Sequence, residues 1–362
     1  MRPVRAYLAS SARPLAEVYD VALLDLDGVV YIGTDAVPGA PEALAAARTA
    51  GLRLAFVTNN AARTPAVVAQ HLTDLGIEAS PDEVVNSAQA AAHYLSDHLP
   101  SAAKVLVVGT TGLEEALRER GLVPVSHADD DVAAVVQGYS PDLSWRQLAE
   151  GAVAINRGLP WVATNLDPTV PSPRGRLPGN GSLVAALRHA TGAEPITTGK
   201  PDPTMHRESV QRSGATNPIV VGDRLDTDIE GANAVGCASL LVLSGVTSPA
   251  ELLAASEEHR PTFISADLTG LLEVHDELEA ADGAVVCGRW RASSTSDELT
   301  LRRTGDDLPA GAAADDLDAL RALCAAQWAD GSDAKARLGV DGDDETQRSE
   351  AAAVLDRLGL RD

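Results

Sequence analysis

Short, wholly apolar runs alternate with helical segments along most of this chain, and this alternation is the strongest constraint on its fold. Val21–Leu24 and Leu52–Val57 are two such runs, and a helical stretch from about Pro41 to Ala50 lies between them. The runs are apolar throughout rather than at every second position, which indicates strands that are buried on both faces. Strands of this kind in βαβα order predict an α/β fold with a doubly wound parallel sheet.

A second β/α series interrupts the first, and a different texture follows it. The second series has expected strands at 104–108, 133–137 and 161–163 and expected helices at 112–120, 144–156 and 182–191. The first series resumes with strands at 219–221, 239–243 and 262–264. After about Ala280 we expect a hairpin of strands 285–292 and 298–302 and a final helix at 344–358.

These patterns divide the chain into a core, an insertion and a small C-terminal α+β module. We place the core at residues 17–82 and 190–275, the inserted cap at 83–189 and the module at 281–362. The first sixteen residues carry three arginines, no acidic residue and no long apolar run. They are expected to form a flexible tail.

Charge and cysteine content limit the partners of this chain. Acidic residues outnumber basic ones by 52 to 29, which argues against nucleic acid and against an anionic membrane surface. An anionic substrate would therefore need a local cation. Three scattered cysteines and the lack of an apolar run of about 18 residues favour a reducing cytoplasm without a membrane span.

Asp25 and Asp27 form a pair of carboxylates directly after the first expected strand. Their spacing lets both face the same side, and Gly28 allows the chain to turn sharply after them. Two close carboxylates repel each other unless a cation or a proton intervenes. The pair can be a nucleophile and a general acid beside a divalent metal, or simply an acidic turn.

Three further polar segments lie at or beyond the carboxyl ends of expected strands. In an open α/β sheet, ligands bind at this edge. Thr58 and Asn59 can hold an oxyanion, or cap the next helix. Lys200, held between Gly and Pro, can neutralise a phosphate, or be a solvated loop residue. Asp223 and Asp228 follow a clean apolar strand and offer the oxygen ligands that Mg²⁺ prefers, while Asp226 and Asp228 can also cap the following helix.

Together, these four segments resemble the motifs of the haloacid dehalogenase superfamily. Asp25 with Asp27, Thr58, Lys200, and Asp223 with Asp228 match them in order, and the second aspartate favours phosphoryl chemistry over dehalogenation. The long insertion is placed like the type 2A cap of that superfamily. The phrases Thr58-Asn59-Asn60 and Thr164-Asn165-Leu166-Asp167 resemble the branch of NagD, 4-nitrophenylphosphatases and phosphoglycolate phosphatases. The tail is similar to that of an actinobacterial subgroup assigned to glycerol 3-phosphate.

The resemblance implies a role for each matching residue. Asp25 would attack phosphorus while Asp27 protonates the leaving alcohol. Mg²⁺ would be held by Asp25, the main-chain carbonyl of Asp27, and Asp223, with Asp228 orienting a metal-bound water. The phosphoryl oxygens would be held by Thr58, Asn59 and Lys200.

The substrate implied is a small phosphomonoester, with glycerol 3-phosphate first and phosphoglycolate, nucleotides or sugar phosphates as alternatives. The loop 165–181 carries Asn165 and Asp167, which suit glycerol hydroxyls, and Arg174 and Arg176, which suit a carboxylate. A homodimer is allowed. A non-catalytic regulatory protein is a second hypothesis, which the full set of motifs argues against. Acyl transfer by the tail is a third, because its order of strands and helices resembles a fragment of a GCN5-type acetyltransferase. The tail lacks the R-x-x-G-x-G/A loop with which that family binds acetyl-CoA, which argues against catalysis and favours a structural or interaction role.

Overall fold

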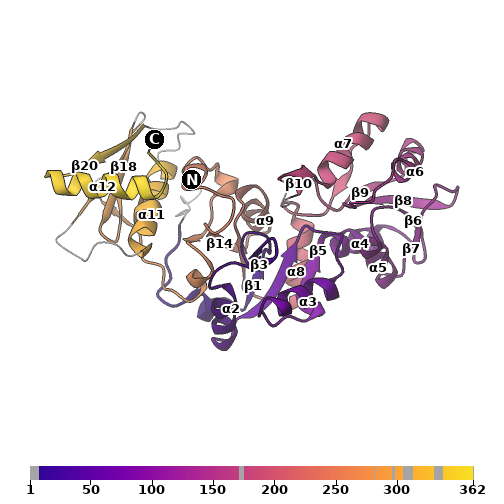
Figure 1. Cartoon of the computed structure of the whole chain (residues 1–362), viewed down its shortest axis with the longest axis horizontal. Helices are drawn as coiled ribbons and strands as arrows, with labels where there is room; N and C mark the ends of the chain where they lie inside the picture. The colour runs from indigo at the N-terminus through magenta and orange to yellow at the C-terminus, as the bar shows by residue number, and fades with distance from the viewer. Residues whose placement is uncertain are drawn as a thin grey trace, which may run out of the picture.

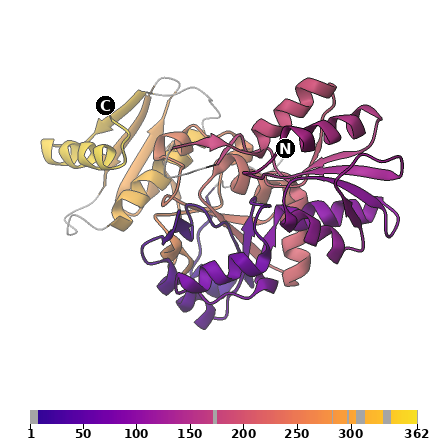
Figure 2. The ribbon, with the colours of Figure 1, turned by 45° about the vertical axis from the view of Figure 1, so that its right-hand side comes forward.

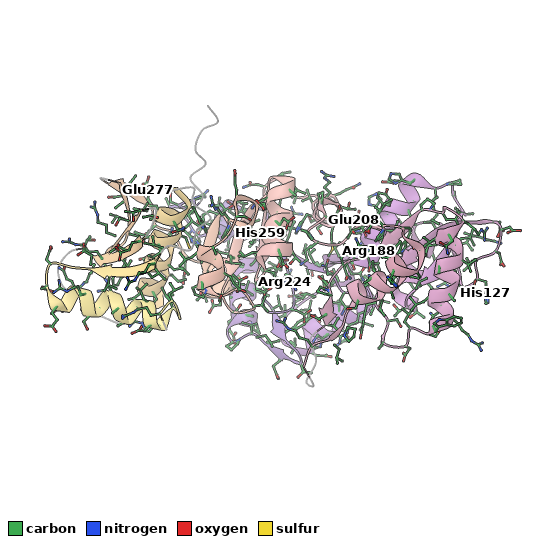
Figure 3. The ribbon with its side chains drawn as sticks, turned by 90° about the horizontal axis from the view of Figure 1, so that it is seen from above. His127, Arg188, Glu208, Arg224, His259 and Glu277 are labelled. Carbon is green, nitrogen blue, oxygen red and sulfur yellow. The ribbon has the colours of Figure 1, made fainter. Side chains whose placement is uncertain are left out.

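The computed structural model describes residues 8–170, 175–281, 283–295, 298–304, 313–329 and 337–361. Three parts lie in a row, with the C-terminal module at one end, the core in the middle and the cap at the other end (Figure 1). Seen from above, Glu277 marks the module, Arg224 and His259 mark the core, and His127 marks the far end of the cap (Figure 3). This arrangement leaves the core in contact with both other parts.

The core is a six-stranded parallel sheet with helices on both faces, so the predicted doubly wound α/β class is confirmed. Ala43 and Leu44 pack on one face, and Met205 and Ala232 on the other. The strands, in spatial order, are β15 (Phe263–Ser265), β14 (Ala238–Val242), β13 (Pro218–Gly222), β1 (Val21–Leu24), β4 (Arg53–Thr58) and β5 (Val84–Asn86). The helices are α1 (Leu15–Val18), α2 (Ala40–Thr49), α3 (Pro65–Asp74), α8 (Pro203–Ser213), α9 (Glu230–Val235) and α10 (Pro249–Leu253), and a small hairpin pairs β2 (Tyr31–Ile32) with β3 (Asp35–Ala36).

The position of β1 in this order explains where a ligand can bind. The chain moves from β1 to β4 and β5 on one side, and later fills the other side with β13, β14 and β15. The order of the strands therefore reverses at β1. In open α/β sheets ligands bind beyond the carboxyl ends of the strands at such a reversal, which is where Asp25 lies.

The cap is a second parallel sheet that is likewise covered on both faces. Its strands, in spatial order, are β12 (Ile196–Thr197), β9 (Trp161–Ala163), β8 (Val132–Gln137), β6 (Lys104–Val108) and β7 (Val123–Val125). One face carries α4 (Ser87–His98) and α5 (Thr111–Glu119), and the other carries α6 (Trp145–Asn156) and α7 (Asn180–Thr191). A two-stranded ribbon of β10 (Thr169–Val170) and β11 (Leu177–Pro178) extends from it.

Strand pairing places the boundaries between core and cap a few residues from 83 and 189. Residues 84–86 pair with β4 and complete the core sheet, whereas residues 196–197 pair with β9 and belong to the cap sheet. The reason is that each crossing segment continues a sheet before it turns into the next helix. Composition does not change at either point, so the sequence gives no signal there.

In the described residues, the C-terminal module has a five-stranded sheet and two helices. The strands, in order, are β16 (Glu279–Ala281), β17 (Ala284–Cys287), β18 (Trp290–Ser294), β19 (Glu298–Arg303) and β20 (Arg337–Asp341), and the helices are α11 (Ala313–Ala329) and α12 (Glu345–Arg357). The expected single strand 285–292 is instead two strands, because the chain turns at Gly288, whose φ is 53°. Leu320, Leu323 and Trp328 of α11 share one hydrophobic cluster with Leu252 and Ile264 of the core.

The expected flexible tail is wrong for residues 8–16. Leu8 is buried in the cluster between core and module, and the main-chain N–H of Ala9 donates to the carbonyl of Thr262. Ser11 forms a bridge with His275, and Leu15 is fully buried. This segment therefore packs along the core, while residues 1–7 fall outside the described residues (Figure 2). The arginine content of the first sixteen residues suggested a flexible tail, although two leucines of this stretch, Leu8 and Leu15, are buried.

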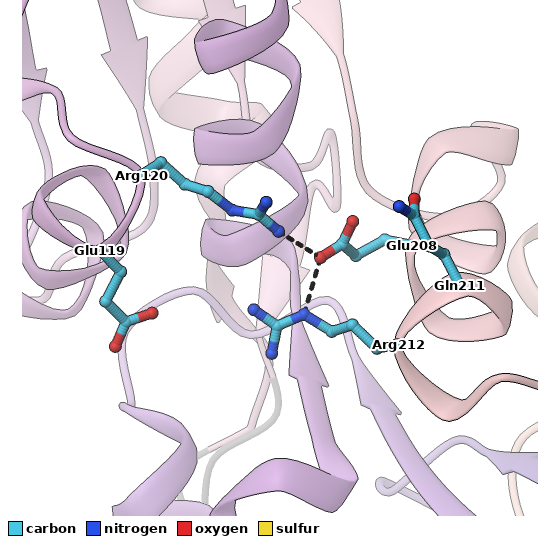
Figure 4. Close-up of a pocket in the computed structure, with 5 residues that line it drawn as sticks. All are labelled: Glu119, Arg120, Glu208, Gln211 and Arg212. Carbon is cyan, nitrogen blue, oxygen red and sulfur yellow. Dashed lines mark hydrogen bonds and ion pairs between the residues drawn. The ribbon is translucent and has the colours of Figure 1, made fainter. Parts of the chain in front are cut away.

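Glu208 of α8 ties the core to the cap through ionic hydrogen bonds (Figure 4). Its Oε1 accepts from Arg120 Nη2 of the cap at 2.8 Å and from Arg212 Nε of its own helix at 2.7 Å. Its Oε2 contacts Nδ1 of His93 in cap helix α4. Burial alone would raise the pKa of Glu208, but Arg212, His93 and Arg120 hold it below its ordinary value.

Among the helices of the described residues, none is long and apolar enough to cross a membrane.

Candidate active site

Three carboxylates meet at the carboxyl end of the core sheet. Asp25 follows β1, Asp223 follows β13, and Asp228 lies in the π-helical turn Leu225–Ile229. Each offers an oxygen, and the three oxygens lie within 4.8 Å of one another. Such a cluster of hard oxygen ligands matches the preference of Mg²⁺.

Asp223 is the clearest indication that this cluster fits a cation. Its Oδ1 is buried and accepts no hydrogen bond within the part of the chain that the structure describes, while its Oδ2 accepts from the N–H of Val246 at 2.8 Å. Burial and the charge of Asp228 raise the pKa of Asp223 to about 6. A buried carboxylate oxygen without a donor is costly unless a cation or a proton meets it.

The backbone around Asp223 leaves no room for larger residues. A Cβ atom on Gly245 would lie 1.9 Å from Asp223 Oδ2, and one on Gly28 would lie 2.5 Å from the same atom. Gly28 also has a φ of 87°, which only glycine adopts readily. The loops after β1 and β14 thus enclose the carboxylate between two glycines.

Lys200 links two of the carboxylates. Its Nζ donates to Asp25 Oδ1 at 2.5 Å, to Asp228 Oδ1 at 2.7 Å and to the carbonyl of Val57 at 3.2 Å. Burial alone would lower the pKa of Lys200, but Asp228 and Asp25 raise it above its ordinary value. Burial raises the pKa of Asp25, and the ammonium of Lys200 opposes that rise. The predicted proximity of Lys200 to the nucleophile candidate is thus present.

Asp228 uses both of its oxygens within the protein. Oδ1 accepts from Lys200, and Oδ2 accepts from the main-chain N–H of Arg224 at 3.2 Å. Its Cβ would collide with any side chain at Gly222, because a Cβ there would lie 2.2 Å away. These contacts fix the orientation of the Asp228 carboxylate.

Asp27 differs from the other carboxylates because its residue is exposed at the mouth of the site. Even so, the poorly solvated surroundings of its carboxyl group raise its pKa, against the charges of Arg63, Lys200 and His71. No described residue donates a hydrogen bond to its side chain. A carboxyl group with a raised pKa and free access can carry a proton to a reacting oxygen.

Thr58 ends β4, the neighbour of β1, and Asn59 directly follows it, as the sequence predicts. Thr58 is buried, and its Oγ1 accepts from the N–H of Asn60 at 3.1 Å. The Asn59 side chain contacts the main chain of Lys200 instead of pointing into open space. The structure gives Asn59 partners that the sequence did not indicate, and it brings the residues of the four motifs to one sheet edge: Asp25, Asp27, Thr58, Asn59, Lys200, Asp223 and Asp228.

Comparisons with known proteins show the family of this chain. The model for haloacid dehalogenase-like hydrolases matches residues 22–123, and a HAD-hydrolase-like model matches residues 197–271. The D-glycerol 3-phosphate phosphatase of Mycobacterium tuberculosis is 44% identical over 316 residues, which cover 87% of this chain and 88% of that protein. This chain belongs to the haloacid dehalogenase-like hydrolases. The predicted resemblance is confirmed.

Solved structures place this hydrolase among phosphatases with and without the C-terminal module. A crystal structure of a glycerol phosphate phosphatase from M. tuberculosis, in complex with magnesium, has a TM-score of 0.85 at 41% identity and covers 96% of this chain and 100% of its own. The p-nitrophenyl phosphatase from Archaeoglobus fulgidus has a TM-score of 0.65 at 30% identity, covering 70% of this chain and 98% of its own. A GCN5-related N-acetyltransferase like model matches residues 287–360.

The cap of this hydrolase brings a loop over the core site. Asn165 Nδ2 donates to the carbonyl of Asn59 at 2.7 Å, so this amide is engaged with the core rather than open to a substrate. Asp167 Oδ2 accepts from Asn59 Nδ2 at 3.1 Å. Burial raises the pKa of Asp167, and the charge of Arg224 opposes the rise. Arg176 is exposed on the outer ribbon, and Arg174 lies outside the described residues.

The loop after β14 is the part of the site that sequence reasoning missed. Val246 donates its main-chain N–H to the Asp223 carboxylate, and Thr247 donates both its N–H and its Oγ1 to the Asp223 carbonyl, at 3.3 and 2.6 Å. The available signal was positional, since the loop follows an apolar strand that ends at the same edge. It carries no acidic or basic residue, so a search for reactive side chains passes over it.

Proposed function

We propose that this hydrolase is a Mg²⁺-dependent phosphomonoester phosphatase that forms an aspartyl-phosphate on Asp25. The observation that carries the proposal is the buried cluster of Asp25, Asp223 and Asp228 around Lys200, with Asp27 at its mouth. Bound at Asp25, Asp223 and the carbonyl of Asp27, Mg²⁺ would neutralise charge on the phosphoryl oxygens. The magnesium complex of the M. tuberculosis relative supports this choice of metal.

The side chains then divide the reaction into two displacements. Lys200 holds Asp25 Oδ1 and so fixes the carboxylate that attacks phosphorus. Asp27 gives its proton to the leaving alcohol oxygen and afterwards takes one from the water that attacks the phosphorus of the aspartyl-phosphate. Lys200, Thr58 and the main-chain N–H of Asn59 are the proposed partners of the phosphoryl oxygens. Lys200 acts there chiefly through its charge, since its three hydrogens already have acceptors.

Glycerol 3-phosphate is the proposed substrate. The relative named for that activity is 44% identical over 87% of this chain, whereas the acid sugar phosphatase of Staphylococcus haemolyticus is 36% identical over 69% of this chain and 94% of its own. The exposed position of Arg176 gives no support for a second anionic group beneath the cap. We therefore place glycerol, a neutral leaving group, ahead of glycolate, the anionic leaving group of phosphoglycolate.

A phosphate-release assay tests this proposal. Glycerol 3-phosphate, phosphoglycolate, nucleoside monophosphates and sugar phosphates would be compared by kcat/KM, with Mg²⁺, with EDTA and with EDTA followed by Mg²⁺. We expect the highest kcat/KM for glycerol 3-phosphate, loss of activity in EDTA and recovery with Mg²⁺. Full activity without metal would contradict the metal role. A tenfold preference for phosphoglycolate, about 1.4 kcal/mol in transition-state binding, would overturn the substrate.

We infer a structural role for the C-terminal module and a cytoplasmic setting for the enzyme. The module shares a buried cluster with the core, and its sequence lacks the glycine-rich loop expected of an acetyltransferase. The three cysteines are free, as they would be in a reducing compartment. A homodimer would be detected by light scattering of the purified protein.

A further inference from the structure

The side chain of Asn59 is matched to the main chain of Lys200. Asn59 Oδ1 accepts from the N–H of Lys200 at 2.8 Å, and Asn59 Nδ2 donates to the carbonyl of Lys200 at 3.1 Å. An amide that bonds both main-chain groups of one residue fixes the orientation of that residue. The residue so fixed is the one whose ammonium lies between Asp25 and Asp228.

The second hydrogen of Asn59 Nδ2 goes to the cap. It is donated to Asp167 Oδ2 at 3.1 Å, and no donor is then left on this side chain, because an amide nitrogen carries two hydrogens. The carbonyl of Asn59 also accepts from Asn165 Nδ2 of the cap and from Ser87 Oγ, at 2.7 and 2.5 Å. One residue of the core thus contacts both the catalytic lysine and the cap loop.

Close packing makes this link stiff. A Cβ on Gly199 would lie 2.8 Å from Asn59 Oδ1 and 2.3 Å from the carbonyl of Thr164 in the cap. The chain before Lys200 is therefore pressed between Asn59 and the end of cap strand β9. A shift of the cap loop at Asp167 would therefore displace the main chain of Lys200, because the Asn59 side chain bonds to both.

We propose that Asn59 is a positioning residue that connects the cap to Lys200, with Asp167 as its partner on the cap. When Asp167 accepts from Asn59, the amide holds the Lys200 main chain and the ammonium stays aligned with Asp25. This inference rests on the proposed phosphatase function and deepens it. It assigns to the Asn59 side chain a task other than holding phosphate, which falls to its main-chain N–H.

The competing role for Asp167 is direct contact with the leaving group, and a pair of substrates separates the two roles. Asp167→Ala would be assayed with glycerol 3-phosphate and with 4-nitrophenyl phosphate, whose leaving group has no hydroxyls to recognise. We expect kcat to fall about tenfold, and by the same factor, for both substrates, in line with the loss of one charge-assisted hydrogen bond. A rise in KM confined to glycerol 3-phosphate would overturn the proposal.

Conservative replacement and a double variant complete the test. Asp167→Asn keeps an oxygen that can accept from Asn59, so its kcat should stay within about threefold of wild type. Asn59→Ala should lower kcat, and adding Asp167→Ala to it should cause no further loss, because the link is already broken. Independent, multiplying losses would overturn the link.

Control measurements show whether the kinetic effects are specific to the contact between Asn59 and Asp167. Asp142 is an exposed aspartate in another cap loop, and Asp142→Ala should leave both kinetic constants unchanged. Thermal melting would establish that each variant is folded. If Asn59→Ala does not fold, the comparison of Asp167→Ala with Asp167→Asn decides alone. Wild-type protein that hydrolyses neither substrate would refute the phosphatase function itself, which is a different result from substrate-dependent losses in a working enzyme.

Discussion

Asp27 is the residue whose environment most distinguishes it from its neighbours. It is exposed, its pKa is raised by the poorly solvated site, and no described residue holds its side chain, whereas Asp25 and Asp228 are held by Lys200. A carboxyl group that must carry a proton to and from the substrate needs this freedom. The two aspartates of one short segment are therefore suited to two different tasks.

Asp27→Asn should lose the proton transfer while keeping the nucleophile. We expect kcat for glycerol 3-phosphate to fall by about 10²–10⁴, the usual contribution of a general acid. The loss should be smaller for 4-nitrophenyl phosphate, because 4-nitrophenolate leaves without much help from an acid. Steady-state rates with both substrates provide the check, and an equal loss with both would refute the acid role.

At the scale of elements, Glu208 fastens helix α8 of the core to the cap. Glu208→Gln should destabilise the protein by about 1–3 kcal/mol near neutral pH, less than a fully buried ion pair would cost because Arg120 and Arg212 are partly exposed. The folded-state pKa of Glu208 is lowered, so its contribution is present above the unfolded pKa and is lost as the pH falls through the folded pKa.

The difference in unfolding free energy between wild type and Glu208→Gln should thus shrink as the pH is lowered below the ordinary glutamate range. Urea unfolding at several pH values measures it. Glu114→Gln provides the matched control, since Glu114 pairs with Arg118 on an exposed face and should change stability by less than about 0.5 kcal/mol at any pH. A gap for Glu208→Gln that does not depend on pH would contradict the ionic link.

Sequence patterns predicted some elements well and missed others for a physical reason. β1 and the interiors of β4 and β13 are apolar runs, because both of their faces are covered. Helix α8 shows no apolar stripe, since it buries His206, Glu208 and Ser209 and not a row of aliphatic residues. A helix that is held by buried polar contacts leaves no periodic signal.

The residues of the active site likewise fall into those that the sequence could predict and those that it could not. Asp25 and Asp223 could be predicted because the strands of a parallel sheet end at one edge, so side chains that follow β1 and β13 come together. Lys200 follows β12 of the cap sheet, so the resemblance to the superfamily motifs predicted it, and not the order of the core strands. The contact between Asn59 and Asp167 could not, because it depends on how the cap sits on the core. The same holds for Val246, which contributes only its main-chain N–H.

For the whole molecule, the important feature is the hydrophobic cluster that joins the core to the C-terminal module. Trp328 of α11 is fully buried in it, near the guanidinium of Arg260 at 5.4 Å. Trp328→Ala should destabilise the protein by about 3–5 kcal/mol and lower Tm. Trp145→Ala is the matched control, because Trp145 is 79% exposed on the cap and its removal should change stability by less than about 0.5 kcal/mol.

The site carboxylates all lie outside this module, so Trp328→Ala should keep its kcat at temperatures where the protein is folded. Calorimetry and phosphate release on the same preparation compare the two properties. Loss of kcat in a folded Trp328→Ala protein would mean that the module contributes to the site. An unchanged Tm would mean that the cluster does not hold the two parts together.

Trapping the phosphorylated carboxylate would show directly whether phosphate is transferred to Asp25. Enzyme quenched during turnover would be reduced with borohydride, which converts an acyl phosphate to an alcohol, and its peptides would be mapped by mass spectrometry. We predict a modified side chain at position 25 in wild type, and neither modification nor phosphate release in folded Asp25→Asn. Modification at another carboxylate, or turnover by Asp25→Asn at a rate near that of wild type, would contradict the account.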